Sequence, residues 1–291
     1  MSNRRESVDA LVHIADIHFW HVTRNPRQLI NKRFIGNLNV WLNRRHQFLR
    51  ARAESYADAI AATGISFALF TGDLTCTALD EEFQMAVRFV RALRERGITL
   101  ALVAGNHDVY TFEARRRKRF ERYFAEYLPW GGYPARLNLP GGTTLLLVPT
   151  ARPNVLSSRG KVRRETLEKV KLFLESTSER VLVASHYPLL TRWGDRTVGK
   201  SRLLVNAQAL RDLLGTSGKS ILYLSGHEHR FDYRRDLTYP TLSHLVTGPL
   251  IRLNRRQGTQ GEFSVIHVTS NGFRIERYVH ENAWKHVEIP L

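Results

Sequence analysis

Residues 99–108 read Thr-Leu-Ala-Leu-Val-Ala-Gly-Asn-His-Asp, an apolar run that stops at a glycine and three polar residues. A short continuous apolar run predicts a strand that is buried on both faces. Similar runs occur at residues 10–15, 67–70, 143–148, 181–184 and 220–224. Between them lie helical patterns at residues 46–63, 79–96, 112–127, 163–175 and 206–214. This alternation of strands and helices predicts a layered α/β fold.

The last part of the chain has a different pattern. Residues 241–247, 263–269 and 273–279 are strand-like, and Ser270-Asn271-Gly272 is typical of a hairpin turn. The sequence contains no internal repeat, low-complexity tract or obvious linker. We therefore expect residues 1–291 to form a single domain.

Side chains that can bind metals follow five of the predicted strands, directly after each strand ends. In an open α/β sheet, ligands bind just beyond the carboxyl ends of the strands. Taken singly, each motif has a structural explanation, such as a turn or a buried histidine. Five of them in chain order, each at a strand end, indicate one shared site. The motifs are Asp16-Ile17-His18, Gly72-Asp73, Gly105-Asn106-His107-Asp108, Ser185-His186 and Gly226-His227-Glu228-His229.

The donor atoms in these motifs are oxygen and nitrogen, without a thiolate. Such a set suits Mn²⁺, Fe or Zn²⁺ rather than a structural zinc site built from cysteines. Asp16 and His18 are two residues apart, so both would point the same way if the segment were extended. His227 and His229 repeat this spacing. The sequence therefore predicts a metal centre at this edge of the sheet.

The complete series of motifs, which spans residues 16–229, resembles the calcineurin-like metallophosphoesterases. The resemblance implies a four-layer α-β-β-α sandwich with two mixed β-sheets. It also implies two divalent ions, with Mn²⁺ as the first choice and Fe or Zn²⁺ as alternatives. Asp73 would bridge the two ions. The first ion would be held by Asp16, His18, Asp73 and His229, and the second by Asp73, Asn106, His186 and His227.

The same resemblance assigns roles to the two residues after Asn106. His107 would face the scissile phosphate and the leaving group, and Asp108 would orient His107. Two metal ions can share a water and deprotonate it near neutral pH, and the hydroxide would attack phosphorus. His107 would stabilise the transition state or protonate the leaving group. The implied activity is metal-dependent hydrolysis of a phosphodiester or pyrophosphate bond.

The segment at about residues 19–54 is too long for a simple connection between a strand and a helix, and we interpret it as an insertion. Residues 24–52 contain eight Lys or Arg and no acid, interleaved with apolar side chains such as Phe34 and Trp41. This mixture is typical of a segment that lies at an anionic membrane surface. It equally fits a surface helix that only packs on the domain.

A second insertion is expected at about residues 109–135, directly after the His107 motif. It contains a run of basic residues that includes Arg115, Arg116 and Arg119, followed by aromatic residues that include Trp130. Clustered arginines can bind a diphosphate through paired hydrogen bonds. We therefore expect these residues, together with Trp41, to contact the substrate, with a solvated helix as the alternative.

The charge and the cysteine content indicate which ligands and which cellular compartment to expect. The chain has 44 Lys and Arg against 27 Asp and Glu, a net charge of +17 that attracts polyanions. The single cysteine, Cys76, excludes an internal disulfide and fits a reducing cytoplasm. No apolar run approaches the roughly 20 residues of a membrane-spanning helix. We expect a cytoplasmic enzyme, peripheral on the inner face of the membrane, without an obligate protein partner.

The motifs do not select one substrate. Within the family, the chain resembles the UDP-2,3-diacylglucosamine hydrolases of lipid A synthesis, which implies release of UMP and a lipid monophosphate. The resemblance is carried by Asn25-Pro26 through Asn31-Lys32-Arg33, then Gly36 and Asn39, then Arg44-Arg45. A soluble phosphodiesterase for cyclic nucleotides or nucleic acid would share the metal site and the positive charge. A non-catalytic scaffold is a third alternative, but it would be expected to lack some of the motif residues, and all are present here.

Overall fold

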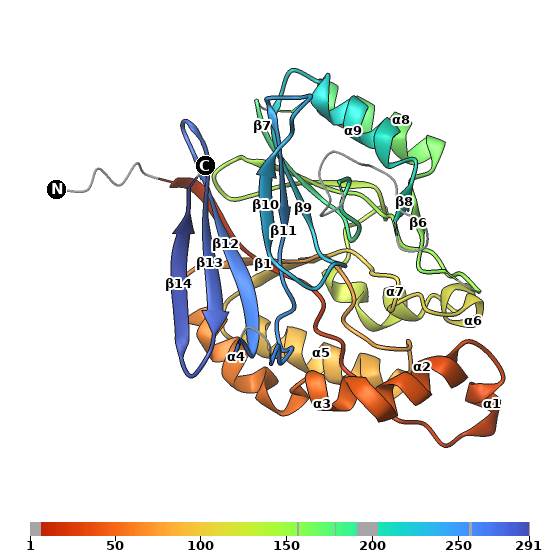
Figure 1. The fold of residues 1–291 in the computed structure, drawn as a ribbon. Helices are drawn as coiled ribbons and strands as arrows, with labels where there is room; N and C mark the ends of the chain where they lie inside the picture. The colour runs from red at the N-terminus through yellow and green to blue at the C-terminus, as the bar shows by residue number, and fades with distance from the viewer. Residues whose placement is uncertain (1–6, 156, 178, 191–202, 256–257, 291) are drawn as a thin grey trace.

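Two six-stranded mixed sheets lie face to face in the computed structural model, with helices on their outer sides (Figure 1). The structure describes residues 7–155, 157–177, 179–190, 203–255 and 258–290. The four-layer sandwich expected from the sequence is therefore confirmed. The first sheet has the order β14-β13-β12-β1-β2-β3. Its strands are β1 (Ser7–Ile14), β2 (Phe67–Phe70), β3 (Thr99–Leu102), β12 (Gly261–Thr269), β13 (Gly272–His280) and β14 (Trp284–Ile289).

The second sheet has the order β10-β11-β9-β7-β5-β4. Its four inner strands are parallel, and the two edge strands are antiparallel to their neighbours. The strands are β4 (Ala135–Asn138), β5 (Thr144–Leu147), β7 (Arg180–Ala184), β9 (Ser220–Ser225), β10 (Asp232–Arg235) and β11 (Leu242–Val246). A separate small ladder pairs β6 (Gly160–Lys161) with β8 (Leu204–Val205).

Three apolar clusters fill the three interfaces between the four layers. One lies between the sheets and includes Leu11 of β1 and Leu182 of β7. A second packs the first sheet against α4 (Ala53–Ala61) and α5 (Asp80–Glu95). The third packs the second sheet against α8 (Arg164–Glu175) and α9 (Ala207–Gly215). Because both sheets are covered on both faces, their inner strands read as continuous apolar runs.

Two of the expected helices are broken. Residues 46–63 hold only the end of α3 (Arg45–Gln47), a 3-10 turn at Arg50–Arg52, and α4, because Phe48 adopts an extended conformation and pairs with Arg252. Residues 112–127 divide into α6 (Phe112–Arg116), α7 (Arg119–Tyr123) and a 3-10 turn at Ala125–Tyr127. The break lies at Lys118, which has a left-handed backbone with φ 48°. In both places tertiary contacts override a local helical pattern.

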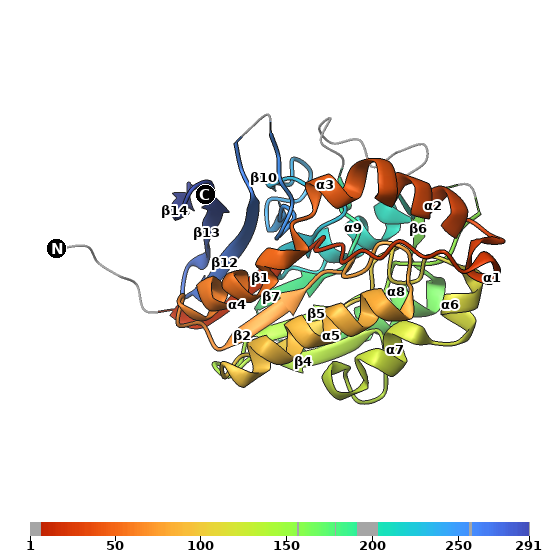
Figure 2. The same cartoon turned by 90° about the horizontal axis from the view of Figure 1, so that it is seen from below.

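The segment after β1 is largely helical. It contains α1 (Pro26–Leu29), α2 (Arg33–Asn39), a π-helical turn at Val40–Arg44, and α3. Figure 2 shows α2 and α3 following one another along an edge of the molecule. Among the residues that the structure describes, no helix is long and apolar enough to cross a bilayer.

A buried ion pair ties α9 to the second sheet. Arg211 donates two hydrogen bonds of 2.7 Å to the carboxylate of Asp236, which follows β10. His244 of β11 lies 2.8 Å from the same carboxylate. Burial alone would raise the pKa of Asp236, but the hydrogen bonds from His244 and Arg211 hold it well below its usual range. The native state therefore stabilises the ionised carboxylate.

Replacing this carboxylate with an amide is expected to destabilise the fold. Asp236→Asn leaves Arg211 buried without its counter-charge, and we expect the free energy of unfolding in urea to fall by about 3–5 kcal/mol at neutral pH. Because the folded-state pKa of Asp236 is depressed, its contribution is present above the unfolded pKa of about 3.9 and is lost as the pH falls below it. The difference between wild type and variant should therefore shrink in acid.

An exposed ion pair provides the control for Asp236→Asn. Arg94 and Glu126 lie 2.7 Å apart with both side chains more than half exposed. Glu126→Gln should change the free energy of unfolding by less than about 1 kcal/mol. An Asp236→Asn variant as stable as Glu126→Gln would contradict a structural role for the buried pair.

Candidate metal centre

The carboxyl ends of five strands from both sheets meet at one place. β1, β2 and β3 are parallel to one another, as are β7 and β9, so the segments that follow them leave the sheets at the same edge. All seven residues expected to bind metal lie on these segments. They are Asp16 and His18 after β1, Asp73 after β2, Asn106 after β3, His186 after β7, and His227 and His229 after β9.

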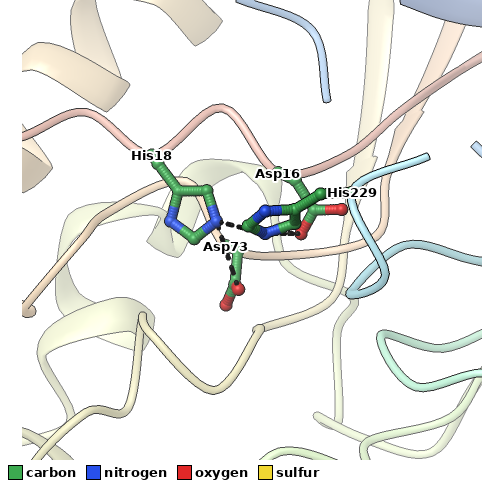
Figure 3. A group of neighbouring side chains, drawn as sticks. All are labelled: Asp16, His18, Asp73 and His229. Atoms are coloured by element: carbon green, nitrogen blue, oxygen red, sulfur yellow. Dashed lines mark hydrogen bonds and ion pairs between the residues drawn. The ribbon is translucent and has the colours of Figure 1, made fainter. Parts of the chain in front are cut away.

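Asp16, His18, Asp73 and His229 form the first group of candidate ligands, and their side chains point toward one another (Figure 3). One donor atom from each lies within 4.8 Å of the others. His18 Nε2 is 2.8 Å from His229 Nε2 and 3.6 Å from Asp73 Oδ2. Asp16 Oδ1 is buried, has no hydrogen-bond partner, and lies 3.7 Å from His229 Nε2. A buried carboxylate oxygen without a donor fits a metal ligand.

Asp73, His186 and His227 form a second group, also with donor atoms within 4.8 Å of one another. His186 Nε2 lies 3.4 Å from Asp73 Oδ2 and 3.2 Å from His227 Nδ1. Asn106 joins this group, since its Oδ1 lies 3.1 Å from His186 Nε2. Asp73 is the residue that the two groups share.

Backbone carbonyls fix two of the imidazole rings. His186 Nδ1 lies 2.7 Å from the Thr71 carbonyl oxygen, and His18 Nδ1 lies 3.3 Å from that of Thr75. A carbonyl oxygen only accepts, so His186 carries a proton on Nδ1, and its Nε2 atom faces the cluster. Such outer contacts are how proteins orient histidine ligands.

The backbone at most of the candidate ligands is not extended, contrary to what was expected from the sequence for the segments at 16–18 and 227–229. Asp16, His18, Asp73, His227 and His229 all have left-handed backbones, with φ between 53° and 72°. The segments at 16–18 and 227–229 are therefore not extended. The left-handed backbone, and not the alternation of a strand, sets the direction of their side chains. Left-handed backbones are uncommon in residues other than glycine, cost of order 1–3 kcal/mol each, and cluster at functional sites.

Two glycines allow the loops to approach this closely. A Cβ atom built on Gly105 would lie 2.2 Å from the Asp73 amide nitrogen, and one on Gly72 would lie 2.4 Å from the Gly105 nitrogen. Any side chain at either position would push apart the loops after β2 and β3. The glycines in these motifs are thus required by packing around Asp73.

The two buried carboxyl groups among the candidate ligands, Asp16 and Asp73, have pKa values shifted in opposite directions. Burial raises the pKa of Asp16 well above its usual range. Burial also acts to raise the pKa of Asp73, but His186 and His107 outweigh it and hold that pKa well below normal. Burial alone would lower the pKa of His186, yet the Asp73 carboxylate raises it to about 9. Buried acids this close together favour a cation among them.

His107 and Asp108 lie beside the cluster, but their relation differs from the expected one. His107 Nδ1 donates to the Cys76 carbonyl oxygen at 2.5 Å, so Cys76, not Asp108, orients the ring. Asp108 accepts from the amides of Gly105 and Thr75 and from the Thr75 hydroxyl, which also contacts the His107 carbonyl. Asp108 therefore shapes the loop that carries His107. The Cys76 thiol is buried, which raises its pKa to about 12.

The model of the calcineurin-like phosphoesterases matches residues 10–231, which include every residue of the two groups. This chain belongs to that family. Its enzyme class is therefore metal-dependent phosphoester hydrolase, and the family centre is dinuclear. Among proteins of curated function, no sequence matches the chain.

Solved structures show the same fold for this phosphoesterase. A dimetal phosphatase from Danio rerio is 13% identical, with a TM-score of 0.65 over 98% of this chain and 100% of its own. Purple acid phosphatase PPD1 from yellow lupin is 11% identical, with a TM-score of 0.58 over 97% of this chain and 53% of its own. A 5′-nucleotidase from Candida albicans is 14% identical, with a TM-score of 0.50 over 93% of this chain and 51% of its own.

Two arginines that the sequence analysis did not assign to the site touch the phosphoesterase centre. Arg44, from the π-helical turn, donates to His107 Nε2 at 3.1 Å and lies 3.3 Å from His18 Nδ1. Arg252 lies 3.3 Å from His229 Nδ1. Arg252 lies outside every motif, and Arg44 belongs only to the residues that resemble the UDP-2,3-diacylglucosamine hydrolases, without a role in the metal site. The two residues reach the centre where residues 47–49 pack against residues 251–253.

The residues expected to contact the substrate from the second insertion have other surroundings. Arg119 is buried and pairs with Glu113 and Asp80, and Arg115 pairs with Glu121. Arg116 is exposed, and Trp130 is fully exposed. The structure thus brings none of these four side chains to the metal ligands through a described contact. Trp41 is 48% exposed on the first insertion, where Arg45 lies over its ring.

A cavity of about 920 Å³ opens beside the first group of ligands. One wall comes from the first insertion and includes Leu42, Asn43 and Gln47. The opposite wall comes from residues 228–230 and 252–255 and includes His229 itself. Next to the cavity, the first insertion presents an exposed stripe that we call the apolar face. Its residues are Ile30, Phe34, Ile35, Leu38, Trp41 and Leu42.

Proposed function

We propose that this phosphoesterase hydrolyses a phosphodiester or pyrophosphate bond with two divalent ions. The shared position of Asp73 between the two groups is the observation that supports two ions. Asp16, His18, Asp73 and His229 would hold one ion, and Asp73, Asn106, His186 and His227 the other. The oxygen and nitrogen donors suit Mn²⁺, with Fe or Zn²⁺ as alternatives. We further propose one domain over residues 1–291, with insertions at about 19–54 and 109–135.

The bound ions would supply Lewis-acid activation of water and of the phosphoryl oxygens. The protein's own contribution comes from His107 and Arg44. Because His107 donates through Nδ1 to Cys76, its Nε2 atom is the one directed toward Arg44 and the reacting groups. Burial and the neighbouring Arg44 lower the pKa of His107 to about 3, which leaves the ring neutral. We propose that Arg44 supplies the positive charge that His107 lacks, stabilising the leaving oxygen.

Removal of the Arg44 guanidinium should therefore slow turnover. For bis(4-nitrophenyl) phosphate, a soluble diester, we expect Arg44→Ala to lower kcat by about 10²-fold, the usual effect of deleting one donor to a developing charge. Arg45→Ala is the matched control, since Arg45 is exposed and lies over Trp41. If both variants keep kcat within about twofold of wild type, Arg44 has no role in the reaction.

The apolar face supports a finer proposal about the substrate. Ile30, Phe34 and Ile35 are 82%, 59% and 68% exposed. A cluster of large exposed apolar side chains marks an interaction surface, and nearby Arg24, Arg27 and Arg45 are also exposed. Leu42 belongs both to this face and to the cavity wall. An amphiphile held in an anionic bilayer would satisfy both features at once.

We therefore propose that the substrate is a nucleotide-lipid, with UDP-2,3-diacylglucosamine as the first choice, cleaved to UMP and the lipid monophosphate at the inner face of the membrane. The aliphatic and aromatic side chains of the apolar face would enter the acyl boundary. The diphosphate would then lie at the depth of the cavity and the metal ligands. In this arrangement the first insertion would serve both membrane binding and substrate access.

The test is a turnover assay with Mn²⁺-loaded protein in detergent micelles. UDP-2,3-diacylglucosamine would be compared with a cyclic nucleotide, single-stranded DNA and bis(4-nitrophenyl) phosphate. We expect rapid UMP release from the lipid nucleotide, and none from Asp73→Ala, because Asp73 is common to both ligand groups. Turnover of the generic diester without the lipid would retain the metal chemistry and contradict the substrate.

A charge placed on the apolar face separates membrane binding from chemistry. Ile35→Asp should reduce hydrolysis of the lipid nucleotide in anionic vesicles while leaving that of the soluble diester near wild type. Leu172→Asp, at an exposed leucine of α8, is the matched control. Equal rates for both variants on vesicles would show that this face does not meet the membrane.

A further inference from the structure

The cavity beside the first ligand group carries more positive than negative charge. Among the residues that the structure describes, Arg230, Arg252 and Arg255 line it, together with a single acid, Glu228. Arg230 Nε lies 3.6 Å from a Glu228 carboxylate oxygen, so this acid is already matched by one arginine. Arg252 and Arg255 are therefore in excess over the acids of the lining.

Arg252 is the arginine of this cavity that combines partial burial with contact to a candidate metal ligand. One of its terminal nitrogens faces His229 Nδ1 at 3.3 Å, and the other donates to Gln47 Oε1 at 3.2 Å. Its Nε is buried and has no acceptor in the part of the chain that the structure describes. Within the described residues, no carboxylate lies within ion-pair distance of Arg252. A buried donor and an unpaired charge are both costly unless a ligand completes them.

The neighbourhood makes an anion the appropriate ligand. Arg44 contacts His18 and Arg252 contacts His229, so two positive charges face the first ligand group from the protein side. A phosphoryl group is doubly suited to this position, since it offers charge and several acceptor oxygens to a guanidinium. Leu42 and Leu253 line the same cavity and could contact an apolar group beyond the anion.

An anion bound at Arg252 would lie next to the first ligand group. His229 belongs both to the first ligand group and to the cavity lining, and it contacts Arg252 directly. A substrate with one phosphoryl group at the metal ligands would therefore extend its next group into the cavity. In a diphosphate substrate, this next group is the second phosphoryl group.

We propose that this cavity is the subsite for the second phosphoryl group of a diphosphate substrate, with Arg252 as its specificity-determining residue and Arg255 at its rim. The inference rests on the proposed function and deepens it. It explains how one metal centre would select a pyrophosphate bond over a simple diester. Arg252 binds the phosphoryl group that is not attacked. Removal of the Arg252 side chain therefore weakens the binding of diphosphates more than that of monophosphates.

Binding measured by calorimetry tests this subsite without turnover. The probes are UMP and the non-hydrolysable uridine 5′-(α,β-methylene)diphosphate, titrated into the Mn²⁺-loaded full chain. They share the uridine, so the ratio of their dissociation constants reports the second phosphoryl group. We expect wild type to bind the diphosphate at least about tenfold more tightly than UMP, and Arg252→Ala to reduce this ratio to about threefold or less.

Additional variants keep the test decisive. Arg252→Gln keeps a polar, hydrogen-bonding side chain without the positive charge and should lose the preference as well, which guards against misfolding of the alanine variant. Arg164→Ala should keep the wild-type ratio, because Arg164 is exposed on α8 and does not line the cavity. Failure of wild type to bind the diphosphate, or an unchanged ratio in both Arg252 variants, overturns the subsite. Turnover of bis(4-nitrophenyl) phosphate by the wild-type protein reads out the proposed function separately, because that ester has one phosphate.

Discussion

The structure depends on a carboxylate that is held from several directions at once. The Asp73 side chain accepts a hydrogen bond from the His107 amide at 2.8 Å and lies within 3.6 Å of His18 and 3.4 Å of His186. These partners follow β1, β3 and β7, so both sheets must be in place before the carboxylate has its surroundings. A buried charge of this kind is stable only where positive charge meets it. The left-handed backbones of Asp73 and four neighbouring ligand residues are the conformational cost of that convergence.

The first insertion connects this centre to the surface. Leu49 donates to the Ile251 carbonyl and Leu253 to that of Gln47, which ties the end of the insertion to the segment that carries Arg252. The same insertion places Arg44 against His107 and Leu42 in the cavity wall. The apolar face, part of the cavity lining and an arginine of the centre therefore belong to one continuous stretch of chain.

The strands and their polar ends could be predicted from the sequence, because buried parallel strands read as apolar runs and their carboxyl ends share an edge. Each expected strand is present, with ends within three residues of those expected. The edge strands β4, β10 and β14 were missed, since partial exposure gives them no continuous apolar run. Arg252 could not be found, and Arg44 could not be given a place at the metal centre, because their positions depend on packing between residues about 200 apart in the chain. The arginines of the second insertion could not be judged either, since Glu113, Glu121 and Asp80 pair with them only in three dimensions.

The central claim is that two ions share the Asp73 carboxylate, and anomalous X-ray scattering tests it most directly. Crystals grown with Mn²⁺ would be measured on both sides of the manganese absorption edge. The account predicts two anomalous peaks, one among Asp16, His18, Asp73 and His229, and one among Asp73, Asn106, His186 and His227. A single peak, or two peaks of which only one touches Asp73, would contradict it.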